Sequence, residues 1–572
     1  MVSRRTPLFV FNCTQSRTQI STARWQLLAA PDSSARLPHP MPVRRPESRK
    51  PSEERFGERL HFFRWKFQVL LDAENARAVM KVTCNIANFQ DRYRMAPVFE
   101  AKRRSIRGNS SGGRSAVAGY PSLVNFMEQK PPQLRHELRA GQMAMVAIGG
   151  SIGTGLLLGS GAAVQIAGPG VILSYILGAL IAFTVTTALG EMSSLHPAAG
   201  SFGVYADKYL NRWAGFISRY GYWFSLVIAI SGELVASATY MRYWFPHIPA
   251  TAWIAGFATL LLILNLGAVH TVGSFEYWFA MIKVVAIAAF ILIGAGLLLG
   301  GGAQARYTTE GGFLPHGAAG PLLALPFVLF NFLGTEMVAI SSGEARSTSD
   351  IVRATYISLS VLTFVYLCAS AVLVGVVPWN LVGVGQSPFV TVFEVAHVPA
   401  ISLVMNFVVL TAALSGANAA LYVTSRMLYS LAESGYAPAR LAQLSANGSP
   451  RNAVLLSASG IVVALVVQYA APQNAFLYII GASLVGGMLA WCIALASHVA
   501  MRKRLLPEQV AALPMRAPGG AAASKVAFAA IVVIVLCTWW TPQARITIVS
   551  AGPYLFLLTV FYLMAKKARS RN

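Results

Sequence analysis

The stretch GGSIGTGLLLGSG, from Gly149 to Gly161, holds six glycines in thirteen residues and lies between long apolar runs. Glycine destabilises a helix by about 1 kcal/mol relative to alanine. Six glycines within one apolar segment therefore need an explanation. A phosphate-binding loop is disfavoured, because no strand precedes the stretch and no GK[ST] motif occurs. Two interpretations remain. Small residues such as Gly155 and Gly159 could let helices pack closely, or an interrupted helix could free backbone groups for a ligand.

Composition identifies the class of protein. The 572 residues are 55% hydrophobic and 12% charged, with a mean hydropathy of +0.54, whereas soluble domains carry about 25% charged residues. Apolar runs of about 20 residues, each long enough to cross a bilayer, recur along the chain. The five cysteines show no spacing typical of disulfides or metal sites. The sequence therefore predicts an all-α protein that crosses the membrane many times.

A second interruption lies in LPFVLFNFLGTEMVAISSGEA, residues 325–345. Its centre, NFLGTE, places Asn331, Gly334, Thr335 and the ionisable Glu336 inside an apolar run. Interrupted helices at corresponding positions of two halves are typical of transporters built from inverted repeats, where freed backbone groups bind the substrate. The pair of interruptions therefore favours the interrupted-helix interpretation of the first stretch.

The apolar runs predict twelve membrane-spanning helices. They cover residues 142–165, 169–194, 213–245, 251–269, 276–299, 318–342, 354–377, 398–430, 453–470, 474–500, 525–541 and 545–565. Lys and Arg concentrate in alternate loops and in the C-terminal tail. By the rule that cytoplasmic loops are the basic ones, this pattern predicts that both termini lie on the cytoplasmic side of the inner membrane.

A family resemblance rests on several motifs, chiefly IGGSIGTGLLLGSG (148–161), FNFLGTE (330–336), GEARSTSDIVRAT (343–355) and ALSGANAALYVTSRMLYSLAESGYAPARL (413–441). With these motifs in this order over residues 133–569, the chain resembles the amino acid permeases of the amino acid–polyamine–organocation superfamily, of the bacterial amino acid transporter type. The resemblance implies a five-plus-five inverted repeat with broken first and sixth helices, followed by two further helices. It also implies uptake of an amino acid coupled to protons.

These observations define the expected domains. Residues 1–126 are rich in Arg, Ser and Pro without a long apolar run, which predicts a disordered basic extension, and we expect the natural start at Met127. The remaining predicted segments are a cytoplasmic leader (127–141), a transporter core (142–500) with repeats at 142–299 and 318–500, a cytoplasmic loop (501–524), and two helices with a tail (525–572).

The first interruption would expose backbone N–H groups at a helix N-terminus, which attracts a carboxylate. We assign the substrate carboxylate to Ser151, Gly153, Thr154 and Gly155. Carbonyls near Ile152 and over 330–332 suit an ammonium. The resemblance implies an aromatic residue that covers the substrate, which by register is Phe330, with Phe332 as second choice. The predicted substrate-binding set is completed by Asn331, Gly334 and Thr335.

Ionisable residues inside the spans are the second group of candidates, because a charge at membrane depth costs at least about 2.5–3.5 kcal/mol. They are Glu191, Glu233, Lys283 and Glu336. We assign Lys283, Glu336 and Glu233 to proton coupling; the resemblance implies that Lys283 lies where sodium-coupled relatives hold an ion. Structural roles stay open: a fixed ion pair for Lys283, orientation of the half-helix for Glu336, and capping or snorkelling for Glu191.

Two polar residues of the eighth predicted span, Ser415 and Asn418, are assigned to the region of the ion site. They lie at helical spacing with Tyr422. Packing between helices explains the same pattern equally well.

The sequence therefore predicts a secondary transporter that imports a neutral amino acid or 4-aminobutyrate by proton symport. An amino acid exchanger is the alternative within transport, and a non-transporting nutrient receptor or a membrane enzyme are alternatives outside it. An enzyme would need metal ligands or a nucleophile and base at membrane depth, and no histidine pair at helical spacing lies within a span. We expect no cofactor beyond the proton gradient, no metal, no nucleic acid and no obligate protein partner; the partners are the substrate and the bilayer.

Overall fold

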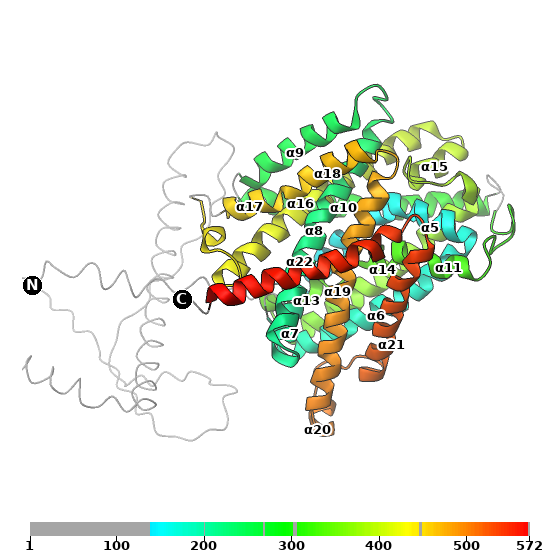
Figure 1. Cartoon of the computed structure of the whole chain (residues 1–572). Helices are drawn as coiled ribbons and strands as arrows, with labels where there is room; N and C mark the ends of the chain where they lie inside the picture. The colour runs from blue at the N-terminus through cyan, green and yellow to red at the C-terminus, as the bar shows by residue number, and fades with distance from the viewer. Residues whose placement is uncertain (1–137, 199–200, 267–268, 301–305, 446–448, 570–572) are drawn as a thin grey trace, which may run out of the picture. The chain divides into compact units, whose positions relative to one another are not determined.

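The computed structural model describes residues 138–198, 201–266, 269–300, 306–445 and 449–569, and the statements below concern these ranges (Figure 1). Helices and their connections make up the described chain, with one isolated β-bridge, between Leu138 and Ala345. The predicted extension 1–126, the start at Met127 and the leader up to residue 137 lie outside the described residues.

The described residues form nineteen α-helices. In chain order they are α4 (Ala140–Ser151), α5 (Ser160–Ala167), α6 (Val171–Leu195), α7 (Ser201–Tyr209), α8 (Arg212–Met241), α9 (Ala250–Leu266), α10 (Val269–Leu299), α11 (Ala319–Leu323), α12 (Leu325–Phe332), α13 (Met337–Ile340), α14 (Thr348–Val376), α15 (Pro388–Val395), α16 (Pro399–Glu433), α17 (Arg451–Ser457), α18 (Ser459–Ala470), α19 (Ala475–Arg504), α20 (Pro507–Ala511), α21 (Gly520–Cys537) and α22 (Arg545–Arg569). The shorter turns are η1 (Gly155–Gly159), which is π-helical, and the 3-10 segments η2 (Gly168–Gly170), η3 (Ser341–Glu344), η4 (Trp379–Leu381), η5 (Ala439–Ala442) and η6 (Thr538–Trp540).

The described residues contain ten helical stretches that are long and apolar enough to cross a membrane. α9 is a shorter apolar helix of 17 residues. Residues 155–195 form one helical stretch, in which η2 makes the turn between α5 and α6. Each of the twelve predicted ranges contains helix, while the layout of twelve spans in a five-plus-five repeat stays a prediction.

α8 and α19 lie at the centre of the described bundle. α8 packs against α16, α18 and α19, and α14 packs against α4, α6 and α10 (Figure 1). Burial follows this arrangement, since 72% of the apolar window of α8 and 78% of that of α19 are buried, against 17% in α22. The interior helices therefore hold the interrupted ones, and the exposed apolar face of α22 suits contact with lipid.

The first predicted interruption is present. α4 ends at Ser151, and the backbone is extended at Ile152 (φ −83°, ψ 91°). The helix resumes as the π-helical turn η1 and continues as α5. A π-helical turn forms bonds five residues apart and is typical of functional positions.

The second interruption is present as well, and it lies beside the first. α12 ends at Phe332, Leu333 is extended (φ −62°, ψ 131°), and Gly334 has a φ of +113°. Glycine adopts this φ without the steric cost that other residues meet. A Cβ atom on Gly334 would lie 2.8 Å from the backbone nitrogen of Ser151, so the two interruptions are in direct contact.

The start of α4 is tied to the segment that follows the second interruption. Leu138 N donates to Glu344 O at 3.0 Å, and Arg346 N donates to Leu138 O at 2.9 Å. Ala140 N donates to Asp350 Oδ1 at 3.1 Å, in the first turn of α14. The two interrupted helices are therefore joined at this end as well as at their middles.

Candidate functional site

Two glycines of the first interruption lie in close contact with side chains of other helices. A Cβ atom on Gly153 would lie 2.7 Å from Glu233 Oε1, and one on Gly155 would lie 2.7 Å from Asn331 Oδ1 and 2.8 Å from Phe330 Cδ1. Real Cβ atoms essentially never come so close to a neighbour. By contrast, a Cβ on Gly159 would make an ordinary contact of 3.5 Å with Ile480. Gly153 and Gly155 therefore lie against Glu233, Asn331 and Phe330, and their role in binding a substrate stays a prediction.

A carboxylate occupies the helix N-terminus at this interruption. Glu233, on α8, accepts a hydrogen bond from Thr154 N through its Oε1 atom at 3.3 Å. Backbone N–H groups and the helix dipole make such an N-terminus favourable for a negative charge. Glu233 therefore takes the place that the sequence assigned to the carboxylate of the substrate.

Lys283, on α10, lies on the other side of the same interruption. The side chain is buried, and its Nζ donates to Gly149 O at 3.3 Å, near the C-terminal end of α4. Its charge is close enough to act on Glu233. The site thus contains a carboxylate and an ammonium, each at a helix end whose partial charge stabilises it.

Glu336 is held differently. Its Oε1 accepts from Tyr222 Oη at 2.8 Å, and its Oε2 accepts from Trp491 Nε1 at 3.2 Å and from Gly334 N at 3.0 Å. These three donors come from α8, α19 and the second interruption itself. The geometry supports the role of orienting the half-helix, and a role of Glu336 in proton coupling stays a prediction.

The two phenylalanines predicted as covers lie on different sides of α12. Phe330 is partly buried and faces Gly155. Phe332 is fully buried and packs against Tyr366, with ring centroids 5.0 Å apart. Thr335 is also buried and accepts from Thr186 Oγ1 at 3.0 Å. The geometry favours Phe330, the first choice, as the aromatic residue at the first interruption.

Several functional candidates lie at the site that the sequence did not single out. Tyr366 Oη, on α14, is 3.0 Å from Ser151 O and 2.8 Å from Asn331 O, and Asn331 Nδ2 donates to Tyr175 Oη at 2.6 Å. Tyrosines buried in apolar spans usually have a polar partner, and this is the signal that could have identified them. α16 approaches Glu233 at Gly416, where a Cβ would lie 2.9 Å from Glu233 Cδ.

Some buried polar atoms near the interruptions have no hydrogen-bond partner among the described residues. They are Ser151 Oγ, Glu233 Oε2, Tyr240 Oη and Asn331 Oδ1. Buried polar atoms are rarely left unpaired, so a group of them at a helix interruption indicates space for a polar ligand or water. Two residues of this group, Ser151 and Asn331, belong to the predicted substrate-binding set.

Of the two predicted ion-site residues on α16, Asn418 contacts α9. Asn418 Oδ1 accepts from Asn265 Nδ2, on α9, at 2.8 Å, and both Asn418 and Ser415 are buried. Their assignment to an ion site stays a prediction.

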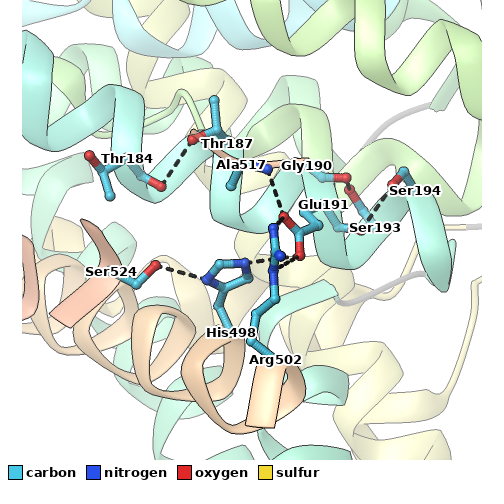
Figure 2. A network of polar contacts seen from close by, with 10 residues as sticks. All are labelled: Thr184, Thr187, Gly190, Glu191, Ser193, Ser194, His498, Arg502, Ala517 and Ser524. Carbon is cyan, nitrogen blue, oxygen red and sulfur yellow. Dashed lines mark hydrogen bonds and ion pairs between the residues drawn. The ribbon is translucent and has the colours of Figure 1, made fainter. Parts of the chain in front are cut away.

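Glu191 lies outside the site, in a polar cluster at the ends of α6 and α19 (Figure 2). Its carboxylate is fully buried, and it pairs with Arg502 Nε at 2.6 Å and with His498 Nε2 at 3.2 Å. Ala517 N also donates to it at 2.6 Å, and Ser524 Oγ lies 2.8 Å from His498 Nδ1. The cluster gives Glu191 a structural role that joins α6, α19 and α21, so it does not snorkel to a surface.

A surface cavity of about 430 Å³ is formed elsewhere, by Tyr243, Glu394, His397, Pro399 and Ser402. None of the predicted site residues lines it. Because none of these five residues belongs to either interruption, the cavity is separate from the candidate site.

Comparison with known proteins agrees with the geometry. The family model for amino acid permeases matches residues 142–568. The gamma-aminobutyric acid permease of Bacillus subtilis (strain 168) is 38% identical over 397 residues, which are 68% of this chain and 85% of that protein. The aromatic amino acid transport protein AroP of Escherichia coli (strain K12) is 36% identical over 449 residues, 77% of this chain and 97% of that protein. The probable threonine/serine transporter YbxG of Bacillus subtilis (strain 168) is 34% identical over 444 residues, 75% of this chain and 95% of that protein.

The match covers both interruptions and the helices that surround them, and the described helices are long and apolar enough to span a membrane many times. The chain belongs to the amino acid permease family of the amino acid–polyamine–organocation superfamily and is an integral membrane protein of amino acid transport.

Proposed function

We propose that this permease imports an amino acid by proton symport, with alternating access to a site at the two helix interruptions. The observation that carries the proposal is the Glu233 carboxylate, which accepts from Thr154 N in the first interruption while Lys283 lies close enough to act on it. The helix N-terminus that would bind the carboxylate of a substrate already binds one from the protein.

Proton coupling follows from the electrostatics of two carboxylates. Two like charges 4 Å apart repel by about 4 kcal/mol at an effective dielectric constant of 20. A substrate carboxylate that binds at Thr154 N therefore favours protonation of Glu233, or its displacement from the N-terminus. The ammonium of Lys283 balances Glu233 before the substrate arrives and the substrate carboxylate afterwards. The proton that enters with the substrate is held on the pair Glu233 and Lys283.

The chemistry of the site favours an amino acid over a simple acid. The C-terminal carbonyls of α4 and α12 carry partial negative charge and suit an ammonium, and Phe330 offers an apolar face. Two relatives are named for transport of gamma-aminobutyric acid and aromatic amino acids, and one as a probable threonine/serine transporter. We therefore propose a neutral amino acid or 4-aminobutyrate as substrate.

The test is uptake by the purified full chain in proteoliposomes under an imposed pH gradient. Labelled phenylalanine, threonine and 4-aminobutyrate are offered first, followed by competition with the other proteinogenic amino acids. We expect accumulation above equilibrium when the outside is more acidic, and loss of this accumulation with a protonophore.

Other outcomes identify the alternatives. Uptake that requires an amino acid inside the vesicle and resists the protonophore would make the protein an exchanger. Binding without any flux would make it a receptor. The proposed orientation, with both termini in the cytoplasm of the inner membrane, is tested by protease access to a C-terminal tag in inverted vesicles compared with intact cells.

A further inference from the structure

One hydroxyl group connects the two interrupted helices. Tyr366 lies on α14, which is continuous, and its side chain is fully buried. Its Oη is 3.0 Å from Ser151 O, the last residue of α4, and 2.8 Å from Asn331 O, in the last turn of α12. The two carbonyls belong to segments 180 residues apart in sequence (331 minus 151) and meet at the same oxygen atom.

The number of protons at this point is smaller than the number of acceptors. A tyrosine hydroxyl donates one hydrogen bond, whereas two carbonyl oxygens lie within reach of it. At any moment one of the two carbonyls therefore receives no bond from Tyr366. A primary ammonium carries three N–H donors, so it could donate to the carbonyl that receives no hydrogen bond from Tyr366.

The electrostatics at the Tyr366 hydroxyl, where α4 and α12 end, also favour an ammonium. The C-terminal ends of α4 and α12 both carry partial negative charge, and both face the Tyr366 hydroxyl. Lys283 Nζ donates to Gly149 O, and the Tyr366 hydroxyl lies within hydrogen-bond distance of Ser151 O and Asn331 O. A single neutral hydroxyl between two negative helix ends leaves the junction favourable for a cation.

Packing fixes the tyrosine ring independently of its hydroxyl. The ring meets Phe332 edge to face at 5.0 Å and Tyr175 at 6.1 Å between centroids. Tyr175 also accepts from Asn331 Nδ2 at 2.6 Å, so the same aromatic pair holds both the side chain and the carbonyl of Asn331. Replacement of Tyr366 by Phe would keep the ring in place and remove only the hydrogen bonds.

We propose that Tyr366 is a positioning residue for the ammonium of the substrate, because its hydroxyl holds Ser151 O and Asn331 O at one point of the site. The inference rests on the proposed transport of an amino acid. It adds a residue on a continuous helix to a site otherwise built from the two interrupted helices, Glu233 and Lys283.

The test compares Tyr366→Phe with the matched control Tyr554→Phe. Tyr554 is also buried and donates to a single backbone carbonyl, Gly221 O, away from the interruptions. For Tyr366→Phe we expect the KM for the transported amino acid to rise about tenfold, equivalent to ~1.4 kcal/mol, with kcat within about twofold of the unmodified chain. Tyr554→Phe should leave both constants within twofold.

A second measurement isolates the ammonium. Phenylalanine and 3-phenylpropionate, and 4-aminobutyrate and butyrate, are compared as inhibitors of labelled uptake. Tyr366→Phe should raise the inhibition constant of each amino acid about tenfold and leave that of the matching acid without nitrogen unchanged. If the acids do not inhibit the unmodified chain, the change in KM against kcat decides alone.

The outcomes separate this inference from the proposed function. An unchanged KM in Tyr366→Phe, a loss confined to kcat, or equal losses for amino acids and plain acids would overturn the role of Tyr366 while leaving transport intact. An unmodified chain that transports no amino acid would instead overturn the proposed function.

Discussion

At both helix interruptions a glutamate accepts a hydrogen bond from a freed backbone N–H group, but the two glutamates are held differently. In the second, Glu336 lies two residues from Gly334, accepts its N–H, and is held by Tyr222 and Trp491. In the first, the N–H of Thr154 is met by Glu233, which comes from another helix and whose Oε2 has no hydrogen-bond partner among the described residues. The second interruption is thus capped by Glu336, whose two carboxylate oxygens both accept hydrogen bonds. The first is capped by Glu233, which has one carboxylate oxygen without a hydrogen bond among the described residues.

This difference indicates which interruption exchanges partners. A carboxylate bonded by three donors from three segments loses all of them when it leaves. Among the described residues, the hydrogen bonds that Glu233 accepts come from Thr154, and an ammonium lies nearby. Since charge-assisted bonds contribute about 1.5–3 kcal/mol each, Glu336 is the costlier group to move. We therefore expect substitutions at the first interruption to change transport, and substitutions at Glu336 to change stability.

The largest effect is expected from Gly155→Ala. The added Cβ would lie 2.7 Å from Asn331 Oδ1 and 2.8 Å from Phe330 Cδ1, so the contact between the two interruptions must open. Overpacking costs typically 1–3 kcal/mol, which corresponds to a loss of uptake of up to about a hundredfold at normal surface expression. Gly159→Ala, whose Cβ meets only ordinary contacts, is the control and should retain uptake. Equal uptake by both variants would contradict the placement of Gly155 at the site.

Glu233→Gln should lower accumulation driven by the pH gradient by up to about a hundredfold, since a hydrogen bond to a charged group contributes about 1.5–3 kcal/mol. Exchange of labelled for unlabelled amino acid should persist, because the amide leaves the substrate carboxylate unopposed. The control is Glu433→Gln, at an exposed carboxylate bonded to Tyr429. Undiminished pH-driven uptake in Glu233→Gln would remove the basis for the proposed coupling.

Lys283→Arg tests the cation of the same pair. A guanidinium keeps its proton at every accessible pH, so a step in which residue 283 releases a proton would stop while its charge remains. We expect pH-driven uptake to fall about tenfold, a smaller loss than in Glu233→Gln because the positive charge is kept. Lys525→Arg, at an exposed position, serves as the control. Normal dependence of uptake on pH would instead indicate a fixed ion pair.

Glu336→Gln should have the smallest effect on the rate of uptake and the clearest effect on stability. The amide presents N–H donors to groups that are themselves donors, at a cost of about 1–3 kcal/mol. The melting temperature of the purified protein in detergent should fall, with the exposed Glu508→Gln close to the unmodified chain. The contrast between the interruptions fails if Glu336→Gln lowers uptake more than Glu233→Gln does.

Much of this site could be predicted from local sequence. Glycine-rich and polar interruptions of apolar runs are visible without knowledge of the fold, and they identified both helix breaks. The binding roles of Gly153 and Gly155 stay predictions. The choice of Phe330 over Phe332 also agrees with the geometry. The π-helical turn Gly155–Gly159 was not predicted, because the same apolar composition fits an α-helix.

The partners of these groups could not be predicted, because they come from distant segments. Tyr366 is 215 residues from Ser151, Glu233 is 79 from Thr154, and Arg502 is 311 from Glu191. Periodicity gives the buried face of a helix and says nothing about which helix covers it. The ionisable residues could therefore be named as candidates, while the assignment of Glu233 to the first break and Glu336 to the second required the three-dimensional structure.

The bridge at the start of α4 has a mechanical consequence. Leu138 exchanges two backbone hydrogen bonds with the segment of Glu344 and Arg346, and Ala140 N is bonded to Asp350. A swing of α4 away from the bundle must either break these three bonds together or carry the start of α14 with it. Tyr366 lies on that same α14, and its hydroxyl contacts Ser151 O at the other end of α4. α4 and Tyr366 would therefore move together. The junction of the two half-helices would then keep its geometry while access to it changes.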